Sequence, residues 1–234
     1  MPVVPPFPPV PPTPIDPLSA LDDDFQGNSL NPKWLIYKPA ALAAATVGGG
    51  YLLIEIVDGG PGPTGSFWFN DNDGVQIYQL VAGDFIAEIF LELRNAADSG
   101  PPPLADFNVG ILQARDPSGA PLPVGFNYIH DGPAANATAS YQNEDKSTAA
   151  SVSTFDYVAE PVVAQWQQIT RIGQTFSCAY KLNAGDPWIP RTVYDRSVML
   201  PVMPNVLALG PGVYTNNVVG DVSVRCSFFT VRTP

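Results

Sequence analysis

Residues 166–188 constrain the fold more than any other stretch, because they contain two short β-rich runs separated by a two-residue turn. The first run covers 167–172 and the second covers 175–181, with Gly173 and Gln174 between them. Apolar side chains occupy every second position of the second run, as in a strand with one buried face. Two such runs joined by a glycine-containing turn predict a β-hairpin. The tryptophans at the two ends of the stretch would fix this hairpin against an opposing sheet.

Other parts of the chain repeat this pattern of short runs between turns rich in glycine and proline. The expected strands are 51–57, 66–69, 75–80, 85–93, 107–113, 125–130, 151–157, 167–172, 175–181, 191–196, 206–210 and 221–231. Residues 40–45 have a helix-like composition but form a very short segment, whereas the apolar positions of 85–93 recur at every second residue and favour a strand. Residues 131–150 contain few large apolar side chains and predict a long exposed loop. About a dozen short strands with few helical patterns indicate an all-β antiparallel sandwich.

The first 21 residues are expected to form an extended arm, and residues 22–234 the folded domain. Nine of the first seventeen residues are proline. Proline lacks an amide hydrogen and has a fixed φ angle, so this segment predicts polyproline II, with a disordered linker as the alternative. Val4, Phe7 and Val10 recur with the three-residue period of that helix and fall on one side. We expect this row to anchor the arm to other subunits and the chain to form a homo-oligomer.

The composition limits the partners and the compartment. The net charge is −11, from 22 acidic and 11 basic residues, which disfavours nucleic acid and anionic membrane as partners. No secretory signal is recognisable and no apolar run approaches the ~20 residues of a membrane span, so we expect synthesis in the cytoplasm. The two cysteines, Cys178 and Cys226, are too few for a disulfide scaffold. We expect buried thiols, with a single bridge as the alternative.

Several segments of the chain match, in order, the pattern of a known superfamily. The matching positions are Asp24, Phe25, Leu30 and Trp34, the segments 49–54, 77–87 and 107–111, then Trp166, Ile169, Arg171, Gly173, Phe176, Tyr180 and Trp188, and finally Val222, Val224, Phe228 and Val231. They resemble the concanavalin A-like lectin/glucanase superfamily, and in particular its laminin-G-like jelly-roll accessory domains, which occur in bacterial glycoside hydrolases and in secreted or viral proteins. The resemblance implies a jelly roll over roughly residues 22–232. It says little about a ligand, because each matching residue also has a core or turn explanation.

No catalytic residue and no cofactor are predicted. Active glycoside hydrolases of this superfamily carry an acidic cluster on one strand, and the candidates here are Glu88 and Glu92, preceded by Asp84. We interpret them instead as the polar face of an amphipathic strand. His130 is the single histidine and is expected at a solvated strand end, where it supports neither a zinc site nor a serine–histidine pair.

Two groups of residues are candidates for binding. Tyr128, Tyr141 and Trp188 could form an aromatic platform for a sugar, although packing under a loop is an equally common outcome. Asp71 and Asp73 offer oxygen ligands at alternate positions and are weak calcium candidates. A turn rich in Asn and Asp is the favoured interpretation of that segment, so no metal site is predicted.

Low charge, a proline-rich arm and a lectin-like domain together predict a non-enzymatic virion structural protein. We expect a phage head-decoration, fibre or tail component that is located in the virion after synthesis in the host cytoplasm. Its expected partners are other subunits of the particle, and a cell-surface glycan is a further candidate. A carbohydrate-binding module or lectin is the alternative, followed by a glucanase-type glycoside hydrolase.

Overall fold

A computed structural model of the chain describes the sandwich and parts of its loops. The described residues are 16–37, 42–56, 68, 74–102, 107–118, 127–136, 140–150, 152–215 and 222–234. The arm residues Val4, Phe7 and Val10 and the calcium candidates Asp71 and Asp73 lie outside these ranges, as does all of the expected strand 66–69 except Trp68. The corresponding predictions therefore stay predictions.

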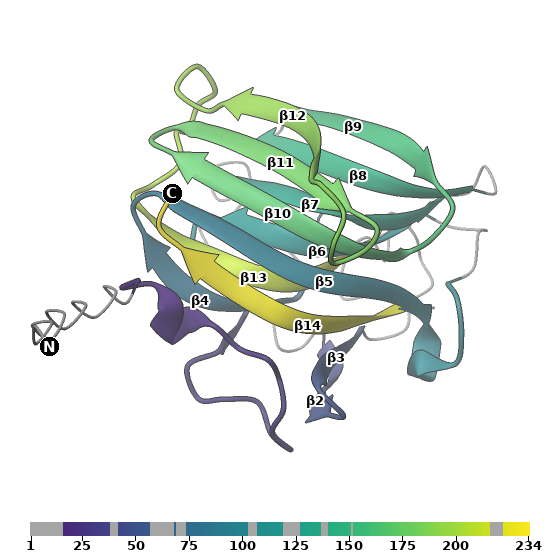
Figure 1. The fold of residues 1–234 in the computed structure, drawn as a ribbon. Coiled ribbons are helices and arrows are strands. Elements are labelled where there is room, and N and C mark those ends of the chain that lie inside the picture. The colour runs from purple at the N-terminus through teal and green to yellow at the C-terminus, as the bar shows by residue number, and fades with distance from the viewer. Residues whose placement is uncertain are drawn as a thin grey trace, which may run out of the picture.

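Two seven-stranded antiparallel sheets pack face to face within the described residues (Figure 1). The first sheet has the order β1 (Leu35–Tyr37), β4 (Gln76–Ala82), β13 (Val206–Thr215), β6 (Asn108–Arg115), β7 (Asn127–Asn136), β8 (Ser140–Ala149) and β9 (Val152–Glu160). The second sheet has the order β12 (Ile189–Asp195), β11 (Thr175–Lys181), β10 (Ala164–Ile172), β5 (Phe85–Asn95), β14 (Val222–Arg232), β3 (Tyr51–Ile56) and β2 (Leu42–Gly48). The described residues also include the short 3₁₀ helices η1 (Ser19–Leu21) and η3 (Ala96–Asp98). The expected all-β antiparallel sandwich is confirmed.

The core lies between the two sheets and follows the alternation of the strands. On β5 the odd-numbered residues from Phe85 to Leu93 are completely buried, and the even-numbered ones are partly exposed. This is the period-two pattern expected of a strand with one buried face. β10 and β11 pair as the predicted hairpin, with Ile172 opposite Thr175 and Gly173 at a φ of 60° in the turn. Both cysteines are free and buried, as expected.

The prediction of a long exposed loop at 131–150 is wrong. These residues belong to β7 and β8, which pair along their whole length from Asn127–Ala149 to Asn136–Ser140. Residues 142–149 of β8 are buried although almost all of them are polar. Hydrogen bonds and ion pairs with the neighbouring strands take the place of apolar contacts here, so hydrophobic periodicity could not reveal this strand. The described part of the helix-like segment, residues 42–45, belongs to β2 (Leu42–Gly48), which pairs with β3.

The described chain joins the sandwich six residues before the expected domain boundary. The Asp16 carboxylate accepts hydrogen bonds from the backbone N–H and the hydroxyl of Thr233, at 2.8 and 2.9 Å. Leu18 and Leu21 pack against the core, so part of the segment assigned to the arm belongs to the folded unit. None of the helices within the described ranges has the length and hydrophobicity to cross a membrane.

Candidate functional site

The face of the first sheet that points away from the second sheet carries an unusual set of buried polar side chains. Asn143 on β8 donates a hydrogen bond to Gln165 on β10 and lies beside Gln167, so the odd-numbered residues of β8 face the second sheet. Glu144 and Lys146 therefore point to the opposite side. Cross-strand pairing extends this outer face to further side chains. They are Gln113 and Arg115 on β6, Tyr128 and His130 on β7, and Tyr214 on β13.

The polar and aromatic groups of β7, β8 and β13 contact one another directly. His130 Nε2 lies 3.1 Å from Glu144 Oε1, and Lys146 Nζ donates to the Tyr214 hydroxyl at 3.1 Å. The His130 ring stacks on Tyr128 with 5.6 Å between ring centroids, and Tyr214 meets it edge-on at 5.1 Å. His130 is completely buried, so the expected solvated strand end is wrong. The reason is that β7 lies inside the sheet between β6 and β8, and the rings of Tyr128 and Tyr214 pack against the His130 ring.

Arg115 lies under a second group of aromatic rings on the same face. Its guanidinium is 3.8 Å from the centre of the Tyr37 ring and 5.8 Å from that of Trp68. Trp68 stacks on Tyr37 at 5.7 Å and meets Tyr128 at 5.8 Å. Arg115 donates to the side chain of Gln76 and has no carboxylate within ion-pair distance in the described part of the chain. A buried guanidinium without an anionic partner is energetically costly and is available to an acceptor from a ligand.

Several polar atoms of this face lack any hydrogen-bond partner within the described ranges. They are both amide atoms of Gln113, Nη2 of Arg115 and Nδ1 of His130. All three residues have no exposed surface. Gln113 pairs directly with His130 across β6 and β7, and Arg115 is two residues further along β6. Because buried polar groups are nearly always hydrogen-bonded in folded proteins, this cluster has the character of a binding site.

Burial favours the neutral forms of the titratable side chains on this face. It raises the pKa of Glu144 to about 8, against the attraction of Lys146, with a further increase from Asp145. Burial likewise lowers the pKa of Lys146 to about 8, and Glu144 opposes that shift. The pKa of His130 is lowered well below its usual value, mainly by burial and then by Lys146. His130 is therefore a neutral ring at pH 7, with one nitrogen beside Glu144 and the other without a partner.

The structure separates the three aromatic residues that were predicted to form a platform. Tyr128 lies on the outer face of the first sheet. Tyr141 is on the opposite side of β8, packed against the core. Trp188 precedes β12 of the second sheet, 4.5 Å from the Lys181 ammonium group. The three side chains do not share a surface.

Sequence reasoning missed four residues of the face. Glu144 and Lys146 belong to the segment 131–150 that was predicted to be a loop. Gln113 is the last residue of the expected strand 107–113, and Arg115 lies two residues after it. The one signal in the sequence is the dense run of polar residues in β8. Such a run is equally compatible with an exposed loop and with a buried polar strand. Only the pairing of β8 with β7 and β9 distinguishes the two.

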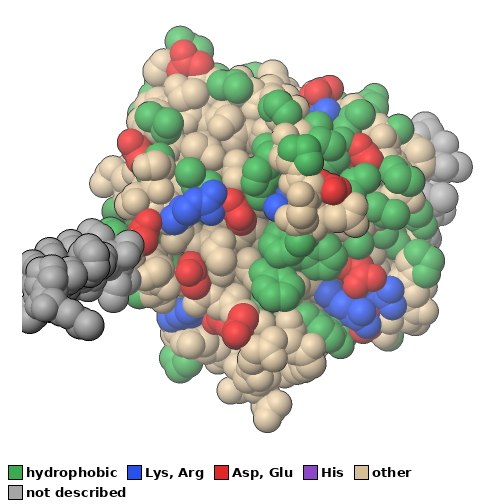
Figure 2. All heavy atoms as spheres, in the orientation of Figure 1, with side chains coloured by type: hydrophobic (Ala, Val, Ile, Leu, Met, Phe, Trp, Pro, Cys, Tyr) green, Lys and Arg blue, Asp and Glu red, His purple; other side chains and the backbone are tan. Residues whose placement is uncertain are grey.

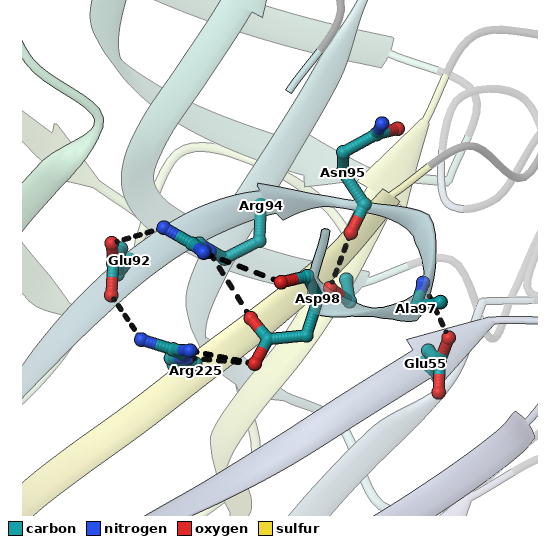
Figure 3. Close-up of polar contacts among 8 residues, drawn as sticks. Glu55, Glu92, Arg94, Asn95, Ala97, Asp98 and Arg225 are labelled. Atoms are coloured by element: carbon teal, nitrogen blue, oxygen red, sulfur yellow. Dashed lines mark hydrogen bonds and ion pairs between the residues drawn. The ribbon is translucent and has the colours of Figure 1, made fainter. Parts of the chain in front are cut away.

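The acidic residues considered for catalysis lie on the outward face of the second sheet. Glu88 pairs with Arg232 at 2.6 Å, and Glu92 pairs with Arg94 at 3.0 Å and with Arg225 at 3.4 Å. Figure 3 shows the two arginines between the carboxylates of Glu92 and Asp98. Four residues of a strand span ~13 Å, which exceeds the ~5–9.5 Å between the two carboxyl groups of glycosidases. These residues form surface ion pairs. The described residues also contain no group of three metal-ligating side chains.

Comparison with known proteins shows similarity of fold alone. No protein-family model and no curated protein sequence matches the chain. A functionally unknown protein from Saccharomyces cerevisiae superposes with a TM-score of 0.64 at 11% identity, over 86% of this chain and 97% of that one. A xylan β-1,4-xylosidase from Bacillus halodurans gives 0.58 at 13% identity, over 97% and 41% respectively. A β-1,3-glucanase from Mycobacterium marinum gives 0.53 at 10% identity, over 90% and 97%.

These matches show a shared β-sandwich, and the two-sheet architecture fits the concanavalin A-like resemblance. The chain spans 41% of the xylosidase, so that likeness concerns part of the larger protein. The expected role as a virion structural protein is contradicted, because the structural neighbours with a named activity are glycoside hydrolases. Its basis was a low charge, a proline-rich arm and a lectin-like domain, and none of these properties is specific to viral particles.

Proposed function

We propose that this protein binds carbohydrate through the outer face of the first sheet and does not hydrolyse it. The observation that carries the proposal is the set of buried polar atoms on Gln113, Arg115 and His130 that have no partner in the described part of the chain. They lie beside the rings of Trp68 and Tyr128. A sugar offers hydroxyl groups that both donate and accept, together with apolar C–H faces, and it matches such a mixture of groups.

Each part of the face has a role in this proposal. The Gln113 amide can donate to one hydroxyl and accept from another, and His130 Nδ1 provides one further hydrogen bond. Arg115 supplies donors held in place by Tyr37 and Gln76. Trp68 is completely buried over this group, so the proposal requires Trp68 to move when a sugar enters. The fold shared with a xylosidase and a glucanase supports a sugar as the ligand.

The carboxyl groups on the described part of the outer face support binding without hydrolysis. Glycoside hydrolases use a pair of Asp or Glu residues on either side of the scissile bond. The described residues of the outer face include one carboxyl group, that of Glu144, and it is in contact with His130. A single acid of raised pKa can bind a hydroxyl but lacks the second group that would act as base or nucleophile.

The test measures binding to a panel of oligosaccharides, including xylan and β-glucan fragments, by calorimetry. Gln113→Leu removes the amide and nearly preserves volume, and we expect it to weaken binding at least about tenfold, equivalent to ~1.4 kcal/mol. Gln168→Leu is the matched control, because Gln168 lies on β10 and contacts Glu88 of the second sheet. Its affinity should equal that of the unmodified protein. Absence of binding across the panel, or equal losses in both variants, would refute the proposal.

Hydrolysis is tested separately on the same panel by the release of reducing sugar. We expect none from the unmodified protein. Turnover that disappears in Glu144→Gln would show that the face is catalytic and would overturn the non-enzymatic part of the proposal. The conservative substitution keeps the size of the side chain, so a folded variant is expected.

A further inference from the structure

The outward face of the second sheet has an aromatic groove that the proposed sugar site does not use. The groove has a volume of about 390 Å³ and is lined by Phe90, Val162, Ala164, Trp166, Leu182, Asn183 and Ala184. Figure 2 shows hydrophobic side chains gathered in the middle of this face. The groove is on the opposite side of the sandwich from Gln113 and His130, so the two sites are independent.

The rings of the groove stand side by side and do not form a flat platform. Trp166 is flanked by Phe90 at 5.5 Å and by Phe228 at 5.6 Å, and the Phe228 ring is stacked at an angle of 25°. The Lys181 ammonium group lies 5.3 Å from the Trp166 ring. Phe228 is 51% exposed. The flat faces of Trp166 are therefore partly occupied, and the surface consists of ridges and gaps between rings. This shape suits small apolar rings such as proline better than the broad face of a sugar.

Phe228 does not line the groove itself but is held against Trp166, at its edge, by an unusual backbone conformation. Its φ angle is 54°, a region that a bulky residue rarely adopts. A β-bulge between Ser227 and Thr230 turns Phe228 outward while Phe229 stays buried in the core. Backbone strain of this kind costs of order 1–3 kcal/mol and is concentrated at functional positions. An exposed aromatic ring held in such a conformation points to an occupant of the groove.

The proline-rich segment 1–15 is a candidate for that occupant, because its side chains are almost all apolar and it is joined to the described chain near the groove. It contains no ionisable side chain, and eight of its fifteen residues are proline. Polyproline II segments bind in grooves lined by aromatic rings. The segment joins the described chain at Asp16, which is bonded to Thr233, five residues after Phe228. Five residues of a strand span ~16 Å. Fifteen residues of polyproline II extend ~46 Å, so the segment can reach the groove of its own chain.

We propose that the aromatic groove binds the proline-rich segment 1–15 of the same chain. Trp166 and Phe228 are the rings against which its prolines and Phe7 pack. Attachment at Asp16 makes this binding intramolecular, and a short tether corresponds to an effective concentration in the millimolar range. Pre-ordered proline residues lose little conformational entropy on binding, which favours a weak but persistent contact.

The test uses the full chain with a nitroxide attached at Val3→Cys, a position outside the Val4, Phe7 and Val10 row. Cys178 and Cys226 are buried, so the new thiol reacts selectively with the label. We expect the nitroxide to broaden the indole N–H resonance of Trp166 in an isotope-labelled sample. Phe228→Ala should abolish this broadening, and Phe228→Tyr, which keeps the ring, should retain it. Phe155→Ala is the matched control, because Phe155 is a phenylalanine of similar exposure on β9 of the first sheet. It should leave the broadening unchanged.

A mixed sample decides whether the contact is made within one chain. In it, the nitroxide is on one population and the isotope label is on another. Broadening in the doubly labelled chain alone supports the proposal. Broadening of equal size in the mixed sample would assign the groove to a second copy and overturn intramolecular binding. No broadening in either sample, or broadening that survives Phe228→Ala, would show that the segment does not occupy the groove.

Discussion

His130 and Glu144 contact each other diagonally across β7 and β8, with 3.1 Å between Nε2 and Oε1. The residue directly opposite Glu144 is Gly132, and the residue directly opposite His130 is Lys146. Because Gly132 has no side chain, Glu144 has space to lean along the strand towards His130. The diagonal contact is compatible with the reach of long side chains on one face of an antiparallel pair. Two titratable groups thus meet in a position without solvent exposure.

The first prediction concerns the pH dependence of stability. Burial raises the pKa of Glu144 from 4.5 to about 8, so between these values the folded protein binds a proton that the unfolded chain has lost. The stabilisation is fully present below pH 4.5 and declines as the pH rises towards 8. Relative to Glu144→Gln, the unmodified protein should therefore lose roughly 1–3 kcal/mol of unfolding free energy between about pH 5 and 8. Denaturant unfolding at several pH values measures this difference, and parallel profiles would contradict it.

The second prediction is that Gly132→Ala disrupts the pairing of β6 with β7. A Cβ atom at Gly132 would lie 1.8 Å from the carbonyl oxygen of Gly110, a backbone atom that cannot move aside without shifting its strand. We expect a loss of more than about 3 kcal/mol of unfolding free energy, or no folded protein. Gly185→Ala is the control, because no heavy atom lies within 4 Å of the position of its Cβ. Thermal unfolding of both variants tests the contrast.

The third prediction concerns Arg196, which is completely buried and connects the segment after β12 to the β7–β8 pair. Its guanidinium donates to Ser147 Oγ at 3.2 Å, to the Thr148 carbonyl at 3.1 Å and to the side chain of Asn127. Arg196→Met leaves these acceptors without a donor and should lower the unfolding free energy by about 2–4 kcal/mol. Arg232→Met removes a partly exposed arginine with one ion pair and should cost less than about 1 kcal/mol. Equal effects in the two variants would contradict the assigned role of Arg196.

The fourth prediction concerns the surface ion pairs of Asp98. Burial by itself would raise the pKa of Asp98, but hydrogen bonds and attraction from Arg225 and Arg94 outweigh it and leave the pKa below 3.8. The resulting stabilisation is present above pH 3.8 and is lost as the pH falls below that value. Asp98→Asn should cost about 0.5–1 kcal/mol at pH 7 and low salt, because the pair is partly exposed. The difference should shrink in 1 M salt, where the screening length falls to ~3 Å. A loss that is independent of salt would rule out an ionic origin.

Much of the architecture could be predicted from local patterns. The buried alternation of β5 and the glycine turn between β10 and β11 depend on neighbours in sequence, and both were predicted correctly. Period-two burial requires one apolar face, and these strands provide it. The same reasoning failed at β8, because its odd-numbered residues face Gln165 and Gln167 while its even-numbered residues face His130 and Tyr214. A strand that is polar on both faces has no hydrophobic period to detect.

The two candidate sites depend on contacts between residues that are distant in the chain. Gln113 meets His130 through the register of β6 and β7, and Trp166 meets Phe228 because β5 lies between β10 and β14. The sequence alone determined the all-β class and the apolar positions of the core, because each of these follows from composition or short-range periodicity. Tertiary structure alone decided which polar groups became buried without partners and which aromatic rings became neighbours. Strand order and register set those distances, and a one-residue change of register would move every one of these side chains to the opposite face.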